Sequence, residues 1–415
     1  MARILLSAYA CEPGRGSEPG VGWSWANELS RLGHQVSVLT RADNRAAIER
    51  EPRPNIEFLY YDLPRWTQRC RKLSAGKSLY YVLWQWFAAR YIRKLFPELP
   101  FDVVQHVTYV SVRYPSFMGS LGIPFYFGPV AGGETVPHGL RADFSFGQKS
   151  REVVRDFSNA LVPLDPMMRS VFNRADKIFV TPDTLALIPR RFRHKCEIEM
   201  PVYLTREYLC KAAAIAKRSS HRVLYAGRLI DWKGLDIALY AIHHLKQWNL
   251  DVRFTIVGDG PAKAKLRKLA DKLGISQVVE WAGWVSQSTL EEHYRTASAL
   301  LFPSLRDAGV TVILEALAHG LPVVCADLGG PGVIVNQHCG RVIATAHKRR
   351  EQLASDFAEA VREILTTTEL HKRLSDGARA RAGQFDFERL VGSVYTLRCS
   401  SLKDDSVREL AESSL

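Results

Sequence analysis

The fold is decided by the stretch FPSLRDAGVTVILEALAHGLPVV, residues 302–324. One short apolar run ends at Phe302 and another begins at Val323, and each is long enough for a buried strand. Residues 312–318 between them favour a helix. A strand, a helix and a second strand in this order predict a βαβ unit with parallel strands.

The same alternation fills both halves of the chain. Short apolar runs predict a series of strands in the first half, at residues 4–8, 35–40, 56–60, 101–107, 123–127 and 177–181. The pattern begins again near residue 222. We therefore predict an α/β protein with two domains, each a mostly parallel sheet covered by helices on both faces, joined between residues 200 and 220.

Length and composition agree with two domains. A chain of 415 residues with 47% hydrophobic residues exceeds what a single core usually accommodates. The net charge of +13 favours an anionic partner, namely a phosphate-bearing substrate, a nucleic acid or an acidic membrane surface. The seven cysteines are scattered and form no Cys-x-x-Cys pair, which argues against a disulfide framework and a zinc ribbon and favours a reducing compartment.

Neither a signal peptide nor a spanning helix is expected. The chain enters its first strand at residues 4–8 with no signal core or cleavage site. The longest apolar stretch, residues 79–89, is shorter than the roughly 20 residues that cross a bilayer. The sequence predicts a cytoplasmic protein.

Two cations and two carboxylates stand out. Arg228 and Lys233 follow a predicted strand, and Asp307 and Glu315 are separated by seven residues. Cations can stabilise a diphosphate leaving group, and carboxylates can accept hydrogen bonds from sugar hydroxyls, so the four predict a nucleotide-sugar site. The plain alternatives are cations that cap a surface turn, a helix N-cap at Asp307 and a solvated Glu315.

In this order, these residues resemble the family 4 retaining glycosyltransferases. The resemblance rests on five segments: 227–234, 257–261, 283–285, 307–315 and 320–324. It implies the GT-B fold, in which two Rossmann-like domains face each other across a cleft. The implied acceptor domain is residues 1–205, with a C-terminal helix at about 386–415 packed back on it, and the implied donor domain is residues 206–385.

The resemblance also implies roles in the donor domain. Arg228 and Lys233 hold the diphosphate, Glu315 the ribose, and Asp307 a hydroxyl of the donor sugar. The base lies beside Gly283, Trp284 and Val285, and the amides of Thr311 and Val312 meet phosphate oxygens. The sequence departs from the family at Asp307, where glutamate is usual, and at Gly309-Val310, where Phe-Gly is common.

In the first half, a glycine-rich loop follows the first strand, as in the family. Its residues Gly16, Ser17, Glu18 and Gly20 are expected to face the cleft, and Gly132 and Gly133 to shape the acceptor pocket. His106 ends a predicted strand and matches, within one residue, the family's cleft histidine near the reacting carbon of the donor sugar. A structural turn or a structural histidine explains each of these features as well.

The mechanism implied is transfer with retention of anomeric configuration, in which the leaving diphosphate helps to deprotonate the acceptor. The chain contains no Asp-x-Asp, and phosphate charge is met by cations and helix amides, so we expect no catalytic metal and no cofactor. The expected donor is a UDP- or GDP-sugar.

Residues 63–97 hold no acidic residue but many basic and aromatic ones. This composition suits an anionic bilayer, although a core helix flanked by solvated cations explains it too. A membrane surface at the inner face of the plasma membrane favours a lipid-linked acceptor, as in exopolysaccharide biosynthesis.

Three other functions share some of these features. An epimerase or a phosphorylase has the same architecture, but nothing in the sequence marks the cofactor lysine of a phosphorylase. A binding module for nucleic acid or membrane is consistent with the charge, but no nucleic-acid motif is present and no nucleic-acid partner is expected. The sequence therefore predicts a glycosyltransferase.

Overall fold

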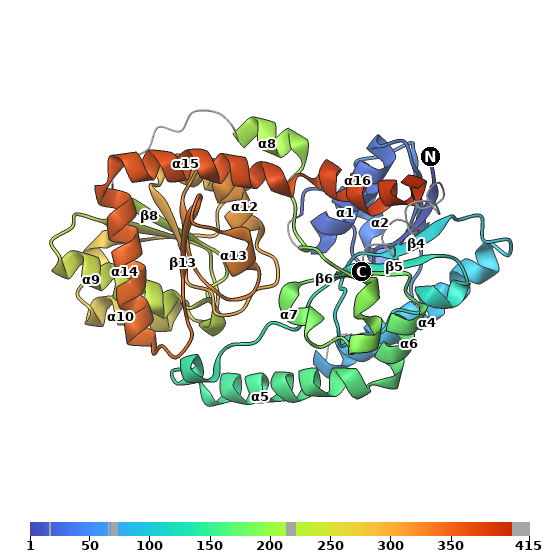
Figure 1. Ribbon diagram of the computed structural model, residues 1–415, viewed down its shortest axis with the longest axis horizontal. Helices are drawn as coiled ribbons and strands as arrows, with labels where there is room; N and C mark the ends of the chain where they lie inside the picture. Colours follow the sequence, from blue (N-terminus) through green and yellow to red (C-terminus); the bar gives the residue numbers. More distant parts are fainter. Residues whose placement is uncertain (16–17, 65–66, 68–73, 213–220, 401–415) are drawn as a thin grey trace, which may run out of the picture.

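The computed structural model in Figure 1 has two α/β lobes side by side. It describes residues 1–15, 18–64, 67, 74–212 and 221–400. Each lobe contains one parallel sheet with helices on both faces, as the sequence predicted. Because both faces of each sheet are covered, strands such as β12 (Val323–Ala326) are buried at every residue, which explains their continuous apolar runs.

The N-terminal sheet has seven strands. Their order is β3 (Ile56–Tyr60), β2 (Gln35–Thr40), β1 (Arg3–Ser7), β4 (Val103–His106), β5 (Phe125–Val130), β6 (Lys177–Val180) and β7 (Cys196–Ile198). The main helices of this domain are α1 (Glu18–Arg31), α2 (Arg45–Ile48), α4 (Ser74–Leu95), α5 (Phe146–Leu161), α6 (Pro166–Arg174) and α7 (Pro182–Leu185).

The C-terminal sheet has six strands. Their order is β10 (Val279–Gly283), β9 (Arg253–Val257), β8 (Arg222–Ala226), β11 (Ala299–Phe302), β12 and β13 (Gly340–Ile343). Its helices are α9 (Leu235–Gln247), α10 (Lys263–Lys272), α11 (Gln287–Thr296), α12 (Thr311–Ala318), α13 (Gly329–Ile334), α14 (Arg350–Thr366) and α15 (Thr368–Ala382). Helix α8 (Arg206–Ala212) precedes this sheet.

The chain crosses between the domains twice, and the two crossings are hydrogen bonded. The amide of Leu204 donates to the carbonyl of Phe385 at 3.0 Å, and the amide of Phe387 donates to the carbonyl of Leu204 at 2.9 Å. After the second crossing, α16 (Phe387–Ser400) lies on the N-terminal domain, where Phe387 packs on Trp25 with ring centroids 5.2 Å apart. The last helix therefore belongs to the core of the first domain (Figure 1).

Each sheet reverses its strand order at one point. In the first sheet the reversal lies between β1 and β4, and in the second between β8 and β11. Helices leave the sheet to opposite faces on the two sides of such a point, so the loops at the carboxyl ends of the strands diverge and leave room for a ligand. A ligand-binding site is therefore expected at each of the two reversal points.

Candidate functional site

The reversal point of the C-terminal sheet brings Lys233 and Asp307 together. Lys233 follows β8 and Asp307 follows β11, which is the neighbouring strand. Lys233 Nζ donates to both carboxylate oxygens of Asp307, at 2.9 and 2.7 Å. Both side chains are only partly exposed, at 14% and 16%. Two residues that the sequence places 74 positions apart thus form one charged pair at the expected edge.

Close backbone packing holds this pair in place. Gly234 has a φ of +65°, and a Cβ there would lie 2.2 Å from the carbonyl oxygen of Pro303. Only glycine allows the two loops to approach this closely. Ser304 Oγ donates to Asp307 at 2.5 Å, and the Gly330 amide donates to the Asp307 carbonyl at 2.7 Å. Lys233 and Ser304 therefore orient the carboxylate, and Gly330 holds the backbone of its loop.

The glycine motifs of the second half meet at the same edge. The Gly227 amide donates to the carbonyl of Val257, and the Gly258 amide donates to the carbonyl of Gly283 at 2.7 Å. A Cβ on Gly258 would lie 2.0 Å from the Gly227 oxygen. Backbone hydrogen bonds thus join the loops after β8, β9 and β10. The side chain of Arg228 in the first of these loops is exposed.

Glu315 lies in α12 and is held by two neutral donors. Tyr294 OH donates to Oε2 at 2.9 Å, and Gln287 Nε2 donates to Oε1 at 3.1 Å. Burial raises the pKa of the Glu315 carboxyl, and the two hydrogen bonds oppose that shift only in part. The carboxylate has no cation among these partners, so it keeps acceptor capacity for a hydroxyl group.

The first turn of α12 has amides available to an anion. Its N-cap residue, Val310, gives no side-chain hydrogen bond to the turn, and Thr311 and Val312 are partly exposed. The positive end of the helix dipole adds to the attraction for phosphate. Trp284, in the loop after β10, is 82% exposed and offers a flat surface beside Gly283 and Val285.

The reversal point of the N-terminal sheet carries part of the glycine loop. Glu18 opens α1, and its Oε2 accepts the amide of Tyr109, in the loop after β4, at 2.6 Å. Burial raises the pKa of Glu18. Gly20 packs against the Arg15 carbonyl, where a Cβ would lie 2.0 Å from the oxygen. The predicted residues Gly16 and Ser17 lie outside the described residues.

His106 does not face the cleft in this structure. Its side chain has no exposed surface, and Nε2 lies 3.1 Å from the Tyr81 hydroxyl and 3.1 Å from the Thr108 carbonyl. Burial lowers its pKa to about 4, so the imidazole is neutral at ordinary pH. All four residues of β4 are buried because helices cover both faces of the sheet, and this explains the difference from our expectation. In this conformation His106 cannot contact a sugar.

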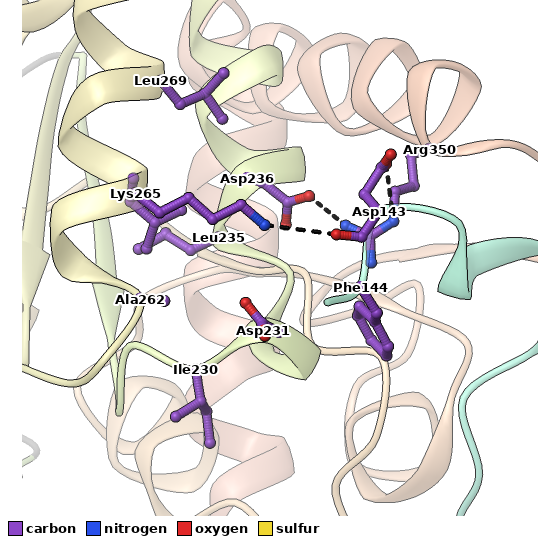
Figure 2. A pocket seen from close by; sticks show the side chains of 11 residues that line it. Asp143, Phe144, Ile230, Asp231, Leu235, Asp236, Ala262, Lys265, Leu269 and Arg350 are labelled. Carbon is purple, nitrogen blue, oxygen red and sulfur yellow. Dashed lines mark hydrogen bonds and ion pairs between the residues drawn. The ribbon is translucent and has the colours of Figure 1, made fainter. Parts of the chain in front are cut away.

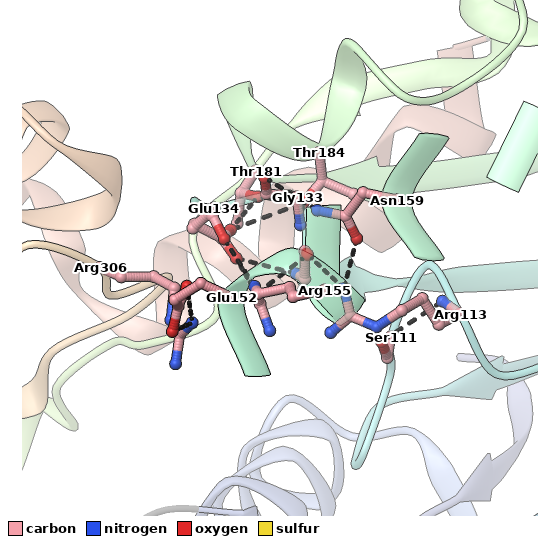
Figure 3. A network of polar contacts seen from close by, with 11 residues as sticks. Ser111, Arg113, Gly133, Glu134, Glu152, Arg155, Asn159, Thr181, Thr184 and Arg306 are labelled. Atoms are coloured by element: carbon pink, nitrogen blue, oxygen red, sulfur yellow. Dashed lines mark hydrogen bonds and ion pairs between the residues drawn. The ribbon is translucent and has the colours of Figure 1, made fainter. Parts of the chain in front are cut away.

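Gly132 and Gly133 form a polar loop after β5. The Gly132 amide donates to Glu134 Oε2 at 2.9 Å, and the Gly133 amide donates to Thr184 Oγ1 at 2.9 Å. Figure 3 shows that arginine side chains gather around this loop. The loop is more than a turn, since its carbonyl groups accept hydrogen bonds from cations that come from separate parts of the chain.

Residues 63–97 are largely a core element where the structure describes them. In α4, the side chains of Tyr80, Tyr81 and Trp84 are buried. Trp86 and Phe87 are partly exposed, and Arg90 lies over the Trp86 ring at 3.7 Å from its centroid. Residues 65–66 and 68–73 lie outside the described residues. The core explanation accounts for most of the aromatic residues that are described.

A small pocket lies where the two domains meet (Figure 2). It is lined by Asp143 and Phe144 from the first domain and by Asp236, Lys265 and Arg350 from the second, among others. Its volume of about 20 Å³ is enough for one water molecule. Arg350 pairs with Asp236 and, at 3.5 Å, with Asp143, so it ties the domains together. This pocket is a domain contact and does not contain the predicted donor residues.

Among the residues that the structure describes, no helix is both long and apolar enough to cross a membrane. Within the same part of the chain, no group of three or more His, Cys, Asp or Glu side chains is arranged to hold a metal ion.

Our sequence analysis missed the arginines around the Gly132 loop. Arg306 binds Glu152 with both carboxylate oxygens, at 2.6 and 2.7 Å, and thereby joins the two domains. The position of Arg306 directly before Asp307 in the sequence could have marked it as a functional residue. Arg113 and Arg155 gave no such signal, because they lie in a loop and in a helix where arginine is ordinary on a surface.

Comparison with known proteins supports the fold and the second domain. Residues 212–381 match the family model described as glycosyl transferases group 1. A D-inositol 3-phosphate glycosyltransferase of Streptomyces bingchenggensis is 31% identical over 189 residues, which are 43% of this chain and 40% of that protein. The chain thus matches less than half the length of this curated relative.

Solved structures extend the likeness to both domains. Sucrose-phosphate synthase from Thermosynechococcus elongatus gives a TM-score of 0.63 at 16% identity and covers 97% of this chain and 100% of its own. The Anabaena protein HepE, solved with UDP and glucose, gives a TM-score of 0.56 at 15% identity with the same coverage. At such identities the likeness concerns the fold alone, and it confirms the expected GT-B architecture.

Proposed function

We propose that this chain is a glycosyltransferase of the retaining, family 4 type. It transfers a sugar from a UDP- or GDP-sugar to a lipid-linked or polysaccharide acceptor in cell-surface or exopolysaccharide synthesis. Residues 206–385 bind the donor, and residues 1–205 with the helix at about 386–415 bind the acceptor. The reaction uses no metal and no cofactor.

The observation that carries the proposal is the Lys233–Asp307 pair. It lies at the reversal point of the sheet in the domain that matches the glycosyl transferase model. Lys233 supplies positive charge to the diphosphate, and Asp307 beside it accepts a hydrogen bond from the sugar. Glu315 accepts from the ribose, and α12 amides meet the phosphate. One ligand, a nucleotide sugar, makes use of all these groups.

A transfer assay tests this function. Purified protein is incubated with a panel of UDP- and GDP-sugars and a lipid-diphosphate sugar acceptor, and the released nucleoside diphosphate is measured. We expect Lys233→Ala to lower the rate at least about tenfold, since a charge-assisted contact to the leaving group is lost. The matched control is Lys348→Ala, which breaks another ion pair of 2.7 Å, with Asp356. Equal rates in both variants exclude the assigned site.

The orientation of α5 supports a lipid-linked acceptor. The polar face of this helix is buried, and its apolar face is exposed. Gln148, Glu152 and Asn159 are buried, whereas Phe146 is 86% and Phe157 is 65% exposed. Further apolar side chains are exposed on α5, in the turn that follows it and on α6: Val153, Val154, Leu161, Leu164 and Met167. Exposed apolar surface of this extent marks a binding face. In Figure 1, α5 lies along one edge of the molecule, below the junction of the domains.

The charge around this face supports an anionic bilayer as its occupant. Lys149, Arg151 and Arg169 are exposed beside the apolar residues. The carboxylates of the same segment are engaged by the protein, since Asp156 pairs with Arg141 and Asp165 caps α6. Apolar side chains flanked by cations are typical of a helix that lies in a membrane interface.

Sedimentation with vesicles tests the membrane surface. We expect the full chain to bind phosphatidylglycerol vesicles, and Phe157→Ser to weaken that binding severalfold. Tyr240→Ser, which changes an exposed aromatic residue of the other domain, serves as the control. No binding at low salt, or a dimer in solution that Phe157→Ser dissociates, excludes the bilayer as the occupant.

A further inference from the structure

Two arginines of the N-terminal domain converge on one oxygen atom. Arg113 Nη1 donates to the carbonyl of Gly132 at 2.7 Å, and Arg155 Nη2 donates to the same carbonyl at 3.0 Å. Arg113 comes from the loop after β4 and Arg155 from the buried side of α5. Asn159 Oδ1 accepts a second bond from Arg113, at 2.5 Å. Two like charges are thus held side by side.

A third arginine reaches the same place from the other domain. Arg306 binds Glu152, which lies one helical turn before Arg155 on α5. Figure 3 shows the side chains of Arg306, Arg155 and Arg113 in a row across the network. The cluster therefore spans both domains, and its C-terminal member is the direct neighbour of Asp307.

The protein neutralises this cluster only in part. Glu152 is engaged by Arg306, and the nearest oxygen of Glu134 lies 3.9 Å from Arg155. The carbonyl oxygens that accept from Arg113 and Arg155 carry no net charge. Burial, and then the charges of Arg113 and Arg306, lower the pKa of Arg155 to about 10. Three cations against two carboxylates leave one excess positive charge in a partly buried place.

Each guanidinium group also keeps donors in reserve. A guanidinium has five N–H groups in a planar fork. The hydrogen bonds of Arg113 come from Nη1 alone, and those of Arg155 come from Nε and Nη2. The remaining donors suit the oxygens of a phosphate group, which arginine binds with two parallel hydrogen bonds. An anion at this place would offset the repulsion between the cations.

We propose that Arg113, Arg155 and Arg306 form a binding site for a phosphate or diphosphate group of the acceptor. This inference rests on the proposed function, because it assigns the anion to the acceptor substrate. The nucleotide diphosphate is assigned elsewhere, to Lys233 and the first turn of α12. Since Arg306 adjoins Asp307 in the chain, a phosphate at the cluster fixes the acceptor beside the donor sugar.

Calorimetric titration of the full chain tests the site with three probes, namely inorganic pyrophosphate, farnesyl diphosphate and UDP. We expect Arg113→Gln and Arg155→Gln each to weaken binding of farnesyl diphosphate about tenfold or more, since each removes a charge-assisted contact. UDP binding stays unchanged in both variants. Arg190→Gln, which removes an exposed arginine of the same domain outside both the cluster and the apolar face of α5, leaves all three probes unchanged.

Further variants separate a lost charge from a damaged fold and separate the two sites. Arg155→Lys keeps the charge and is expected to retain part of the binding that Arg155→Gln loses. Lys233→Ala is expected to weaken UDP alone. If Lys233→Ala leaves UDP affinity unchanged while Arg155→Gln still weakens binding of farnesyl diphosphate, the proposed donor site is excluded and the anion site is supported. If both diphosphates depend only on Lys233, the anion site is excluded.

The two non-nucleotide probes distinguish the source of the phosphate. Tighter binding of farnesyl diphosphate than of inorganic pyrophosphate assigns the site to a lipid-linked acceptor. Equal binding of both, with the same loss in Arg155→Gln, assigns it to a phosphate without a lipid. Binding of neither probe by the unchanged protein overturns the proposal.

Discussion

The substitution Asp307→Asn should lower stability and raise affinity for a nucleoside diphosphate at the same time. Lys233 donates two short hydrogen bonds, of 2.7 and 2.9 Å, to the Asp307 carboxylate. A diphosphate that binds Lys233 has to compete with this carboxylate. Asparagine retains an oxygen that can accept from Ser304 but removes the charge, so Lys233 becomes available to the phosphate.

The size of both effects follows from burial. Exposed ion pairs contribute about 0.2–1 kcal/mol, whereas breaking a buried pair costs about 3–5 kcal/mol. The Lys233–Asp307 pair, with side chains 14% and 16% exposed, lies between these limits. We assign this pair a contribution of about 1–2 kcal/mol to the free energy of unfolding. This predicts a fall in Tm of about 3–6 °C for a domain of this size and a gain in affinity of about fivefold to thirtyfold.

Differential scanning calorimetry gives the first quantity, and titration with UDP and GDP gives the second. Lys233→Ala is expected to lower both stability and nucleotide affinity, so the two variants move the affinity in opposite directions. Asp356→Asn, which breaks the surface pair with Lys348, is the control and should change nucleotide affinity in neither direction. Weaker nucleotide binding in Asp307→Asn, to the degree seen in Lys233→Ala, would refute the competition between Asp307 and phosphate.

Four further results are expected. Glu315→Gln should stabilise the protein above the ordinary pKa of glutamate. Burial raises the pKa of Glu315, so stability is lost as the carboxyl ionises with rising pH. Denaturant titration from pH 4 to 8 should find the largest gain in the free energy of unfolding near pH 8. Burial lowers the pKa of His106 to about 4. Below the ordinary histidine pKa the unfolded chain binds a proton that the native state does not, so the native state loses stability there. His106→Gln should therefore reduce the pH dependence of the unfolding free energy between pH 6.5 and 4. Trp284→Ala should leave Tm unchanged, because the side chain is exposed, and should weaken nucleotide binding about fivefold in the same titration. Transfer in excess EDTA should proceed at the full rate, and a loss that manganese restores would contradict metal independence.

Much of the fold could be predicted from local sequence. Apolar runs of strand length recur between helical segments, and such a pattern allows few arrangements other than parallel sheets covered on both faces. Lys233 and Asp307 each follow a strand directly, so parallel pairing brings both to one edge. Glycines such as Gly234 and Gly258 mark the places where two backbones touch. Chain order alone carries this information.

Other features depended on contacts between distant residues. The periodicity of α5 shows two faces but not which face is buried, and the usual expectation of an apolar inner face is wrong here. Its polar side is buried because Arg306 and Arg113 come from other parts of the chain to bind Glu152 and Asn159. The sequence by itself determined most of the strands and the edge that holds Lys233 and Asp307. Only the tertiary structure decided the buried state of His106, the outward face of α5 and the arginine cluster, because burial and charge depend on which distant segments meet.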